Sequence, residues 1–165
     1  MKRKKNIIDD LAIRMSFEEV PDEDIIALIS VNVQDLEMGD RAGATLLWHA
    51  ASLNRKKLVE WLVANGANIN TQDENDFSAL HIATQEKHTD MVLYLLRNGA
   101  NVNIRDKFGN PPIMRINRST PRELFSILME NGADVDLKNI AGVSFRDISV
   151  ALPEFLDLFN EYMQT

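Results

Sequence analysis

One tripeptide, Asn-Gly-Ala, recurs along the chain at a constant interval, and this repeat constrains the fold more than any other feature. It stands at residues 65–67, 98–100 and 131–133, a step of 33 residues each time. The same step joins Asp40, Asp73, Asp106 and Asn139. Self-similarity at such a period is typical of repeat architectures, in which each unit packs on its neighbours. We therefore expect one solenoid rather than a globule with a single central core.

Each Asn-Gly-Ala follows four apolar residues at spacings of one, three and four, which place them on one helix face. These stripes are Leu58, Val59, Leu62 and Val63, then Met91, Val92, Leu95 and Leu96, then Leu124, Phe125, Leu128 and Met129. The glycine that follows suits the left-handed conformation just past a helix end. A second, shorter helix is expected to begin near Thr45, Ser78, Pro111 and Ser144. Each unit is thus predicted as turn, helix, helix and extended exit.

Residues 78–83, Ser-Ala-Leu-His-Ile-Ala, resemble the Thr-Pro-Leu-His-x-Ala signature of ankyrin repeats, as residues 45–50 do less closely. Residues 87–92, Lys-His-Thr-Asp-Met-Val, are similar to the Gly-His-Leu-Glu-Ile-Val of that family. The resemblance is strong over residues 40–138 and weaker at both ends. It implies an all-α solenoid of helix-turn-helix units with short β-hairpin-like turns.

The period divides the chain into units of one domain, residues 1–165. We expect a divergent amino-terminal unit at 1–39, repeats at 40–72, 73–105 and 106–138, and a carboxy-terminal cap at 139–165. In the first unit Ile25, Ile26, Leu28 and Ile29 continue the stripe after an amino cap at Asp22, and Ile8, Leu11 and Met15 fit a partial first helix. The cap closes on Phe155, Leu156, Leu158 and Phe159. Terminal units differ because they need a polar outer face.

The charge of the chain narrows the choice of partner. Its 18 basic and 25 acidic residues leave a net charge of −7, which argues against nucleic acid and against an anionic membrane surface. The same charge favours solubility and would speed encounter with a basic protein.

No apolar run approaches the roughly 18 residues needed to cross a bilayer. The basic run Lys2–Lys5 is followed by Asp9 and Asp10, which break any signal peptide. We expect a cytoplasmic protein, in which this run is either a solvated terminus or a localisation signal or phosphate contact.

No motif for catalysis or cofactor binding is present. The chain has no cysteine, and it lacks a His-Glu-x-x-His pair, a phosphate-binding glycine loop and a nucleophile elbow. His81 and His88 stand at the family's structural histidine positions, whereas His49 occupies a usually apolar place, where it either has a structural role or contacts a partner. We expect no enzyme, no cofactor, no metal, and a monomer in the absence of a partner.

The resemblance to ankyrin repeats also implies a binding site, because partners of that family lie across the concave face made by the turn tips and first helices. The corresponding residues are Arg41, Ala42, Ala44, Ser52, Leu53, Glu74, Asn75, Phe77, Gln85, Glu86, Lys107, Phe108, Asn110, Arg118 and Ser119. Phe77 and Phe108 are the most informative, since aromatic residues are enriched at interface centres. The alternative is that each ring folds back onto the neighbouring hairpin. One repeat apart, Trp61, Tyr94 and Ile127 are expected to pack between repeats.

The third repeat departs from the family pattern in its first helix. Met114 stands where the family has histidine, and Arg115 and Asn117 stand where small or apolar side chains usually pack. Either a partner uses these polar groups, or the repeat is looser than its neighbours.

The predicted function is a protein-binding module, such as a stoichiometric inhibitor or immunity protein. The alternative is an adaptor that joins two proteins, which needs two separate contact surfaces.

Overall fold

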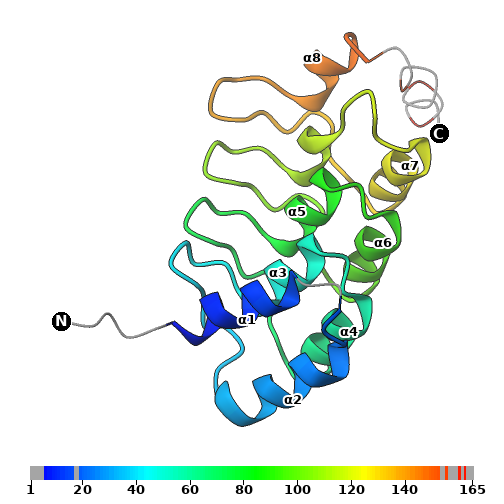
Figure 1. Cartoon of the computed structure of the whole chain (residues 1–165). Coiled ribbons are helices and arrows are strands. Elements are labelled where there is room, and N and C mark those ends of the chain that lie inside the picture. The colour runs from blue at the N-terminus through cyan, green and yellow to red at the C-terminus, as the bar shows by residue number, and fades with distance from the viewer. Residues whose placement is uncertain (1–5, 17–18, 153–154, 156–159, 161, 163–165) are drawn as a thin grey trace.

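The chain, seen in a computed structural model, is described at residues 6–16, 19–152, 155, 160 and 162, and its helices are stacked in series (Figure 1). Their order is α1 (Ile7–Met15), α2 (Asp22–Asn32), α3 (Leu46–Ser52), α4 (Lys56–Ala64), α5 (Ala79–Gln85), α6 (Thr89–Arg97), the 3₁₀ helix η1 (Pro112–Arg115), α7 (Arg122–Glu130) and α8 (Phe145–Ser149). Over the described residues, β pairing is limited to two isolated antiparallel bridges, Gly39 with Thr45 and Gln72 with Ser78. The predicted all-α repeat solenoid is confirmed. None of these helices has the length and apolar character that crossing a membrane requires.

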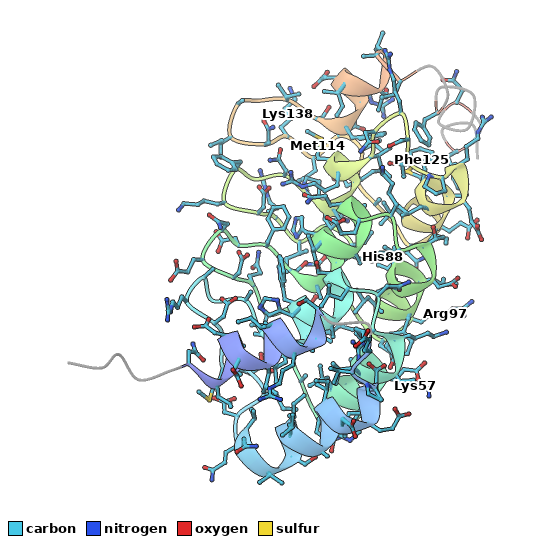
Figure 2. The ribbon with its side chains drawn as sticks, in the orientation of Figure 1. Lys57, His88, Arg97, Met114, Phe125 and Lys138 are labelled. Carbon is cyan, nitrogen blue, oxygen red and sulfur yellow. The ribbon has the colours of Figure 1, made fainter. Side chains whose placement is uncertain are left out.

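The helices form two layers (Figure 1). In the inner layer α1 packs on α3, α3 on α5 and α5 on η1, and in the outer layer α2 packs on α4 and α6 on α7. The turns between repeats project to one side of the inner layer, and the outer helices lie on the opposite side (Figure 1). Lys57 and Arg97 belong to that outer side, away from the turn tips (Figure 2).

The inner helices begin where the sequence predicts, and their caps explain the positions. The hydroxyl groups of Thr45, Ser78 and Ser144 each accept a hydrogen bond from the backbone N–H three residues on. Pro111 at the equivalent position has no side chain that can accept one. Without this cap the third repeat forms only the four-residue η1 instead of a seven-residue helix such as α5, although Pro112 at its first position is compatible with a helix start.

The turns are held by the side chain that opens each of them. In Asp40, Asp73, Asp106 and Asn139, Oδ1 accepts hydrogen bonds from the backbone N–H groups two and four residues later, at 2.7–3.0 Å. Gly43 and Gly109 adopt positive φ of 76° and 78°, and Asp76 takes the same conformation at 58°. Adjacent tips are joined by backbone bonds of 2.9 Å, from Glu74 to Ala42, from Lys107 to Asn75 and from Ile140 to Phe108. The tips therefore form one connected surface.

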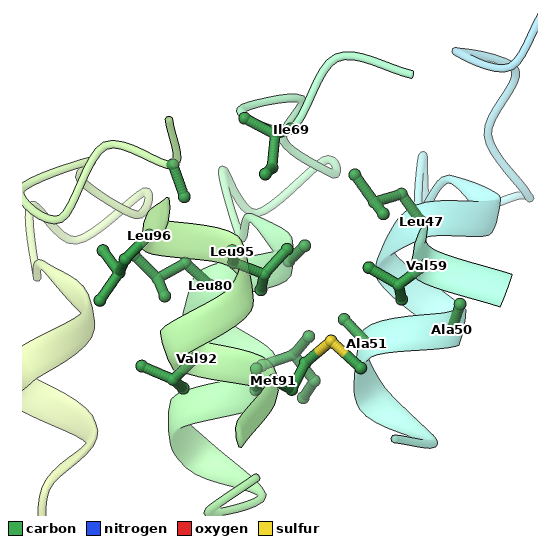
Figure 3. Packing of buried hydrophobic residues seen from close by; sticks show 14 of the residues in the cluster. Leu47, Ala50, Ala51, Val59, Ile69, Leu80, Met91, Val92, Leu95 and Leu96 are labelled. Atoms are coloured by element: carbon green, nitrogen blue, oxygen red, sulfur yellow. The ribbon is translucent and has the colours of Figure 1, made fainter. Parts of the chain in front are cut away.

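The predicted apolar stripes form the core between the two helix layers, and Figure 3 shows side chains of this core. All stripe residues of the three repeats are buried except Val63 and Met129, which are half-buried. Ile127 is buried, and Trp61 and Tyr94 are half-buried against the core, in agreement with a packing role. At the carboxy-terminal end, the Phe125 ring contacts Phe145, Phe155 and Tyr162, with ring centroids 5.8, 5.4 and 6.4 Å away. Leu156, Leu158, Phe159 and Lys2–Lys5 lie outside the described residues.

The amino-terminal unit contains a full pair of helices. Ile8, Leu11 and Met15 are buried in α1, as predicted. The predicted cap at Asp22 is wrong, because Pro21 occupies the cap position and Asp22 is the first residue of α2. The Asp22 carboxylate instead forms an ion pair with Arg55, whose guanidinium also donates to the carbonyl groups of Met15 and Val20. This half-buried arginine fastens α1 and α2 to the repeat that follows them.

Candidate partner-binding surface

The predicted contact residues occupy the turn tips and the ends of the inner helices. The exposed ones are Arg41, Ala42, Leu53, Glu74, Asn75, Gln85, Glu86, Lys107, Phe108, Arg118 and Ser119. Ser52, Phe77 and Asn110 are half-buried. Ala44 is the exception, since it is only 3% exposed. A buried methyl group offers nothing to a partner, so this residue was wrongly included in the surface.

A hollow of about 400 Å³ opens on this side of the molecule and is lined by residues of all three central repeats. It is lined by Trp48, Asp73, Asn75, Phe77, Ile82, Gln85, Phe108, Asn110 and Arg115. Five of these are among the predicted contact residues, and Trp48, Asp73, Ile82 and Arg115 are not. The 33-residue step could have found Asp73, because it is the turn aspartate of its repeat. The hollow itself depends on side-chain conformations that no sequence pattern specifies.

The two phenylalanines of the turns differ in their surroundings. The Phe77 ring is stacked on the His81 imidazole, at 4.9 Å between centroids, and the Arg115 guanidinium lies 4.4 Å from its centroid on the ring face. Phe77 thus folds back onto its neighbours, as the alternative for both rings supposed. Phe108 is 58% exposed, and Ile140 at the next tip is 75% exposed. Sequence reasoning missed Ile140, although a step of 33 residues from Lys107 reaches it.

Arg115 has a partner for its charge within the chain. Its guanidinium forms an ion pair with Asp106, whose side chain is fully buried and also accepts a hydrogen bond from the Asn110 side chain at 3.2 Å. The stacking on Phe77 adds a cation–π contact. Among the described residues, the Nε of Arg115 has no hydrogen-bond partner. The charge of Arg115 therefore belongs mainly to the fold, where it fastens η1 to its turn.

Each of the three histidines makes an intrachain hydrogen bond. His81 is fully buried; its Nδ1 faces the backbone N–H and hydroxyl of Ser78 at 3.2 and 3.0 Å, and its Nε2 lies 3.0 Å from the Asn110 carbonyl of the next repeat. Burial lowers the pKa of His81, which opposes a positive charge at neutral pH. His88, between the helix layers in Figure 2, bonds the Ser52 carbonyl at 2.9 Å. His49 lies 2.9 Å from Asp40.

Two of the predicted cations on this face are engaged within the chain. Arg41 pairs with Asp9 at 3.1 Å, and Arg118 donates to the Ala151 carbonyl at 3.2 Å. These contacts link neighbouring units at the surface. In the part of the chain that the structure describes, no three His, Cys, Asp or Glu side chains come together as a metal site would need.

Stacked helix pairs, connected turn tips and a hollowed inner side define an α-solenoid of the kind that presents an extended contact surface. A family model for ankyrin repeats (three copies) matches residues 15–106 and 47–139. The chain therefore belongs to the ankyrin-repeat family, and the match begins early enough to include α2. Such repeats are protein–protein interaction modules and are generally not catalytic. No curated protein matches the chain.

Proposed function

We propose that this protein is a non-catalytic inhibitor or immunity protein that binds one partner protein in a stoichiometric complex through its turn tips and inner helices. The observation that carries the proposal is the exposed apolar pair Phe108 and Ile140, 58% and 75% exposed at adjacent tips. A turn tip has no core of its own in which to bury these side chains. Aromatic anchors at the centre of an interface contribute a large share of binding energy.

The rigidity of the face supports the same proposal. Backbone bonds of 2.9 Å join each tip to the next, so the surface is organised before a partner arrives. A preorganised surface loses little conformational entropy on binding. The net charge of −7 favours a basic partner, and association with such a partner should slow as salt screens the attraction. We further propose that the free protein is a cytoplasmic monomer.

The test compares Phe108→Ala with Arg97→Ala, a change on the outer side of α6. The tagged protein is used to isolate its partner, and the dissociation constant of the purified complex is then measured for each variant. Phe108→Ala should weaken binding by about 1–2 kcal/mol or more and leave the free energy of unfolding nearly unchanged. Arg97→Ala should change neither. Equal affinities for the two variants would remove the tip face from the interface.

An adaptor is the second candidate, and the amino-terminal unit gives a reason to keep it. This unit exposes Ile13 on α1 and Val31 on α2, at 58% and 83%, far along the solenoid from Phe108. An adaptor needs a second surface of this kind. If Val31→Ser releases a second bound protein while the first stays bound, the adaptor function is supported. A complex of one partner, unaffected by Val31→Ser and lost with Phe108→Ala, supports the inhibitor.

A further inference from the structure

The three turn aspartates of the central repeats have the same backbone role but different charge partners. Nine residues after Asp40, Asp73 and Asp106 stand His49, Ile82 and Arg115. In the first of these repeats, Oδ2 of Asp40 lies 2.9 Å from Nε2 of His49. In the third, Oδ2 of Asp106 is paired with the Arg115 guanidinium. Two of the three repeats thus place a cationic or titratable nitrogen beside the carboxylate that opens the turn.

The middle repeat lacks this partner. Ile82 has no polar atom to offer, and across the described ranges Oδ2 of Asp73 makes no hydrogen bond or ion pair, while its Oδ1 binds the N–H groups of Asn75 and Phe77. Neither Arg115, which lines the hollow, nor His81, which stacks on Phe77, forms an ion pair with Asp73. Burial keeps His81 neutral by lowering its pKa, and Arg115 is paired with Asp106. The half-buried Asp73 carboxylate therefore faces the hollow with its charge uncompensated.

The remaining walls of the hollow suit a flat cation. Trp48 and Phe108 line it with aromatic rings, and Asn75, Gln85 and Asn110 add amide groups that can accept hydrogen bonds. Its volume of about 400 Å³ lies within the usual range for binding pockets, roughly 300–1,000 Å³. A guanidinium group stacks on aromatic faces, is weakly hydrated and pairs with carboxylates through planar donors. Among the residues that line the hollow, Arg115 is the one Lys or Arg, and it is paired with Asp106, so an anionic group there would meet the Asp73 carboxylate without a lining cation to offset it.

We propose that this hollow receives an arginine side chain of the partner protein, whose guanidinium pairs with Asp73 in the place that Arg115 takes beside Asp106. The inference rests on the proposed protein-binding function and specifies the chemistry of one contact within it. The middle repeat is thus left open for a cation from outside the chain, whereas its neighbours supply their own. The proposal also gives the acidic chain a specific point of contact for a basic partner.

The test uses the peptide acetyl-Ala-Arg-Ala-amide, titrated into the intact protein while the indole N–H of Trp48 and the backbone amides are followed by NMR. The expected result is saturable binding in the millimolar range, with shifts confined to the lining of the hollow. Asp73→Asn should weaken binding about tenfold or more, because a charge-assisted hydrogen bond is lost. Asn139 holds its own turn with the same two backbone bonds, at 3.0 Å, so asparagine at position 73 keeps the turn.

Three controls distinguish a specific contact with Asp73 from a general effect of the negative charge of the protein. Asp76→Asn removes the same charge from an exposed site in the same turn and should change the affinity by less than about twofold. The citrulline peptide, which is neutral but nearly the same shape, should not bind. Ile82→Arg should fill the hollow from within and abolish binding. Equal binding by Asp73→Asn and wild type, binding of the citrulline peptide, or no binding of the arginine peptide would overturn the proposal.

This experiment can fail independently of the proposed function. Peptide binding uses no partner, so its loss would leave the effect of Phe108→Ala on the partner complex intact. Conversely, an arginine-binding hollow combined with a partner complex insensitive to Phe108→Ala would show that the hollow binds arginine but that the partner does not use this face, which would overturn the assignment of the arginine to the partner.

Discussion

The second and third repeats have turns held by the same backbone bonds and outer helices of nine residues each, but they hold their inner helices by different means. In the second repeat Ser78 caps a seven-residue helix and shares a capping box with His81. In the third, proline takes the place of the cap and methionine that of the histidine, and only the four residues of η1 are helical. An ion pair between Asp106 and Arg115 fastens this short helix to its turn.

A repeat whose sequence predicts its helix only weakly can therefore still be held firmly by other contacts. Arg115 joins the third repeat to the second by lying over the Phe77 ring, so a charge at a usually apolar position contributes to the interface between repeats. The second repeat, with Ile82 in the equivalent place, leaves its own turn aspartate unpaired. The third repeat has Arg115 where the second has Ile82. This one difference both stabilises the third repeat and leaves the carboxylate of Asp73 open in the second.

The largest expected effect concerns the outer helices. Phe125 is fully buried and contacts three other aromatic rings, whereas Val92 holds the same position in the second repeat. Phe125→Ala should lower the free energy of unfolding by about 3–5 kcal/mol, and Val92→Ala should cost less because fewer atoms are removed. Urea denaturation measures both. If the valine change costs more, the third repeat does not depend on its aromatic cluster as we infer.

The next largest effect on stability comes from the ion pair between Asp106 and Arg115. Asp106→Asn keeps the acceptor that holds the turn but removes the charge paired with Arg115, so it should cost about 2 kcal/mol. Asp73→Asn makes the same change where no cation is paired, and it should cost less than about 0.5 kcal/mol. Denaturation of both variants under one condition gives the comparison. Equal costs would mean that the Asp106–Arg115 pair contributes no more than the turn bonds common to both sites.

The contrast between the two repeats also shows which parts of the structure can be predicted from the sequence. The period of 33 residues, the apolar stripes and the hydroxyl caps predict the helix pairs and their starts, because these depend on local geometry. The Asp106–Arg115 pair could not be predicted in the same way, because it requires knowing that a side chain nine residues later turns back to the carboxylate. The ion pair of Asp22 escapes prediction for a similar reason, since its partner Arg55 lies in the next unit.

The candidate surface was predicted less completely than the fold. A family register places residues such as Phe77 and Phe108 on the tips, but it cannot distinguish a ring stacked on His81 from one that is 58% exposed. That distinction depends on the neighbouring repeat. The Phe77 ring is covered on one face by Arg115. This contact joins residues far apart in the chain.

A smaller effect follows from the histidine that the third repeat lacks. Because burial lowers the pKa of His81, the unfolded state binds its proton more readily than the native state. Stability should therefore fall as the pH drops below the ordinary histidine pKa of about 6.5. His81→Met, which copies Met114, should be less stable at neutral pH and should lose less stability on acidification. Thermal unfolding at neutral and mildly acidic pH measures this. Parallel pH profiles of the wild type and His81→Met would show that His81 is not the source of the dependence.

The smallest effect leaves global stability unchanged and concerns local opening. In α5 the amides of Ile82 and Glu86 donate to backbone carbonyls four residues earlier, at 3.3 and 2.9 Å. After η1, Asn117 and Ser119 donate only to nearby side chains, each at 3.0 Å. Bonds to side chains only two or three residues away open without disturbing the rest of the core. Amides of residues 115–120 should therefore exchange with solvent faster than those of residues 81–86 in the free protein, as measured by native-state hydrogen exchange.

Binding of the partner decides what this local opening means. If residues 115–120 belong to the interface, the partner should slow their exchange, because it covers a segment that the free protein holds loosely. Faster exchange in the free protein that the partner leaves unchanged would keep the weaker segment but remove it from the binding surface. Equal protection of residues 115–120 and 81–86 in the free protein would contradict the comparison itself, since the ion pair and the arginine stacking would then hold η1 as firmly as the cap and histidine hold α5.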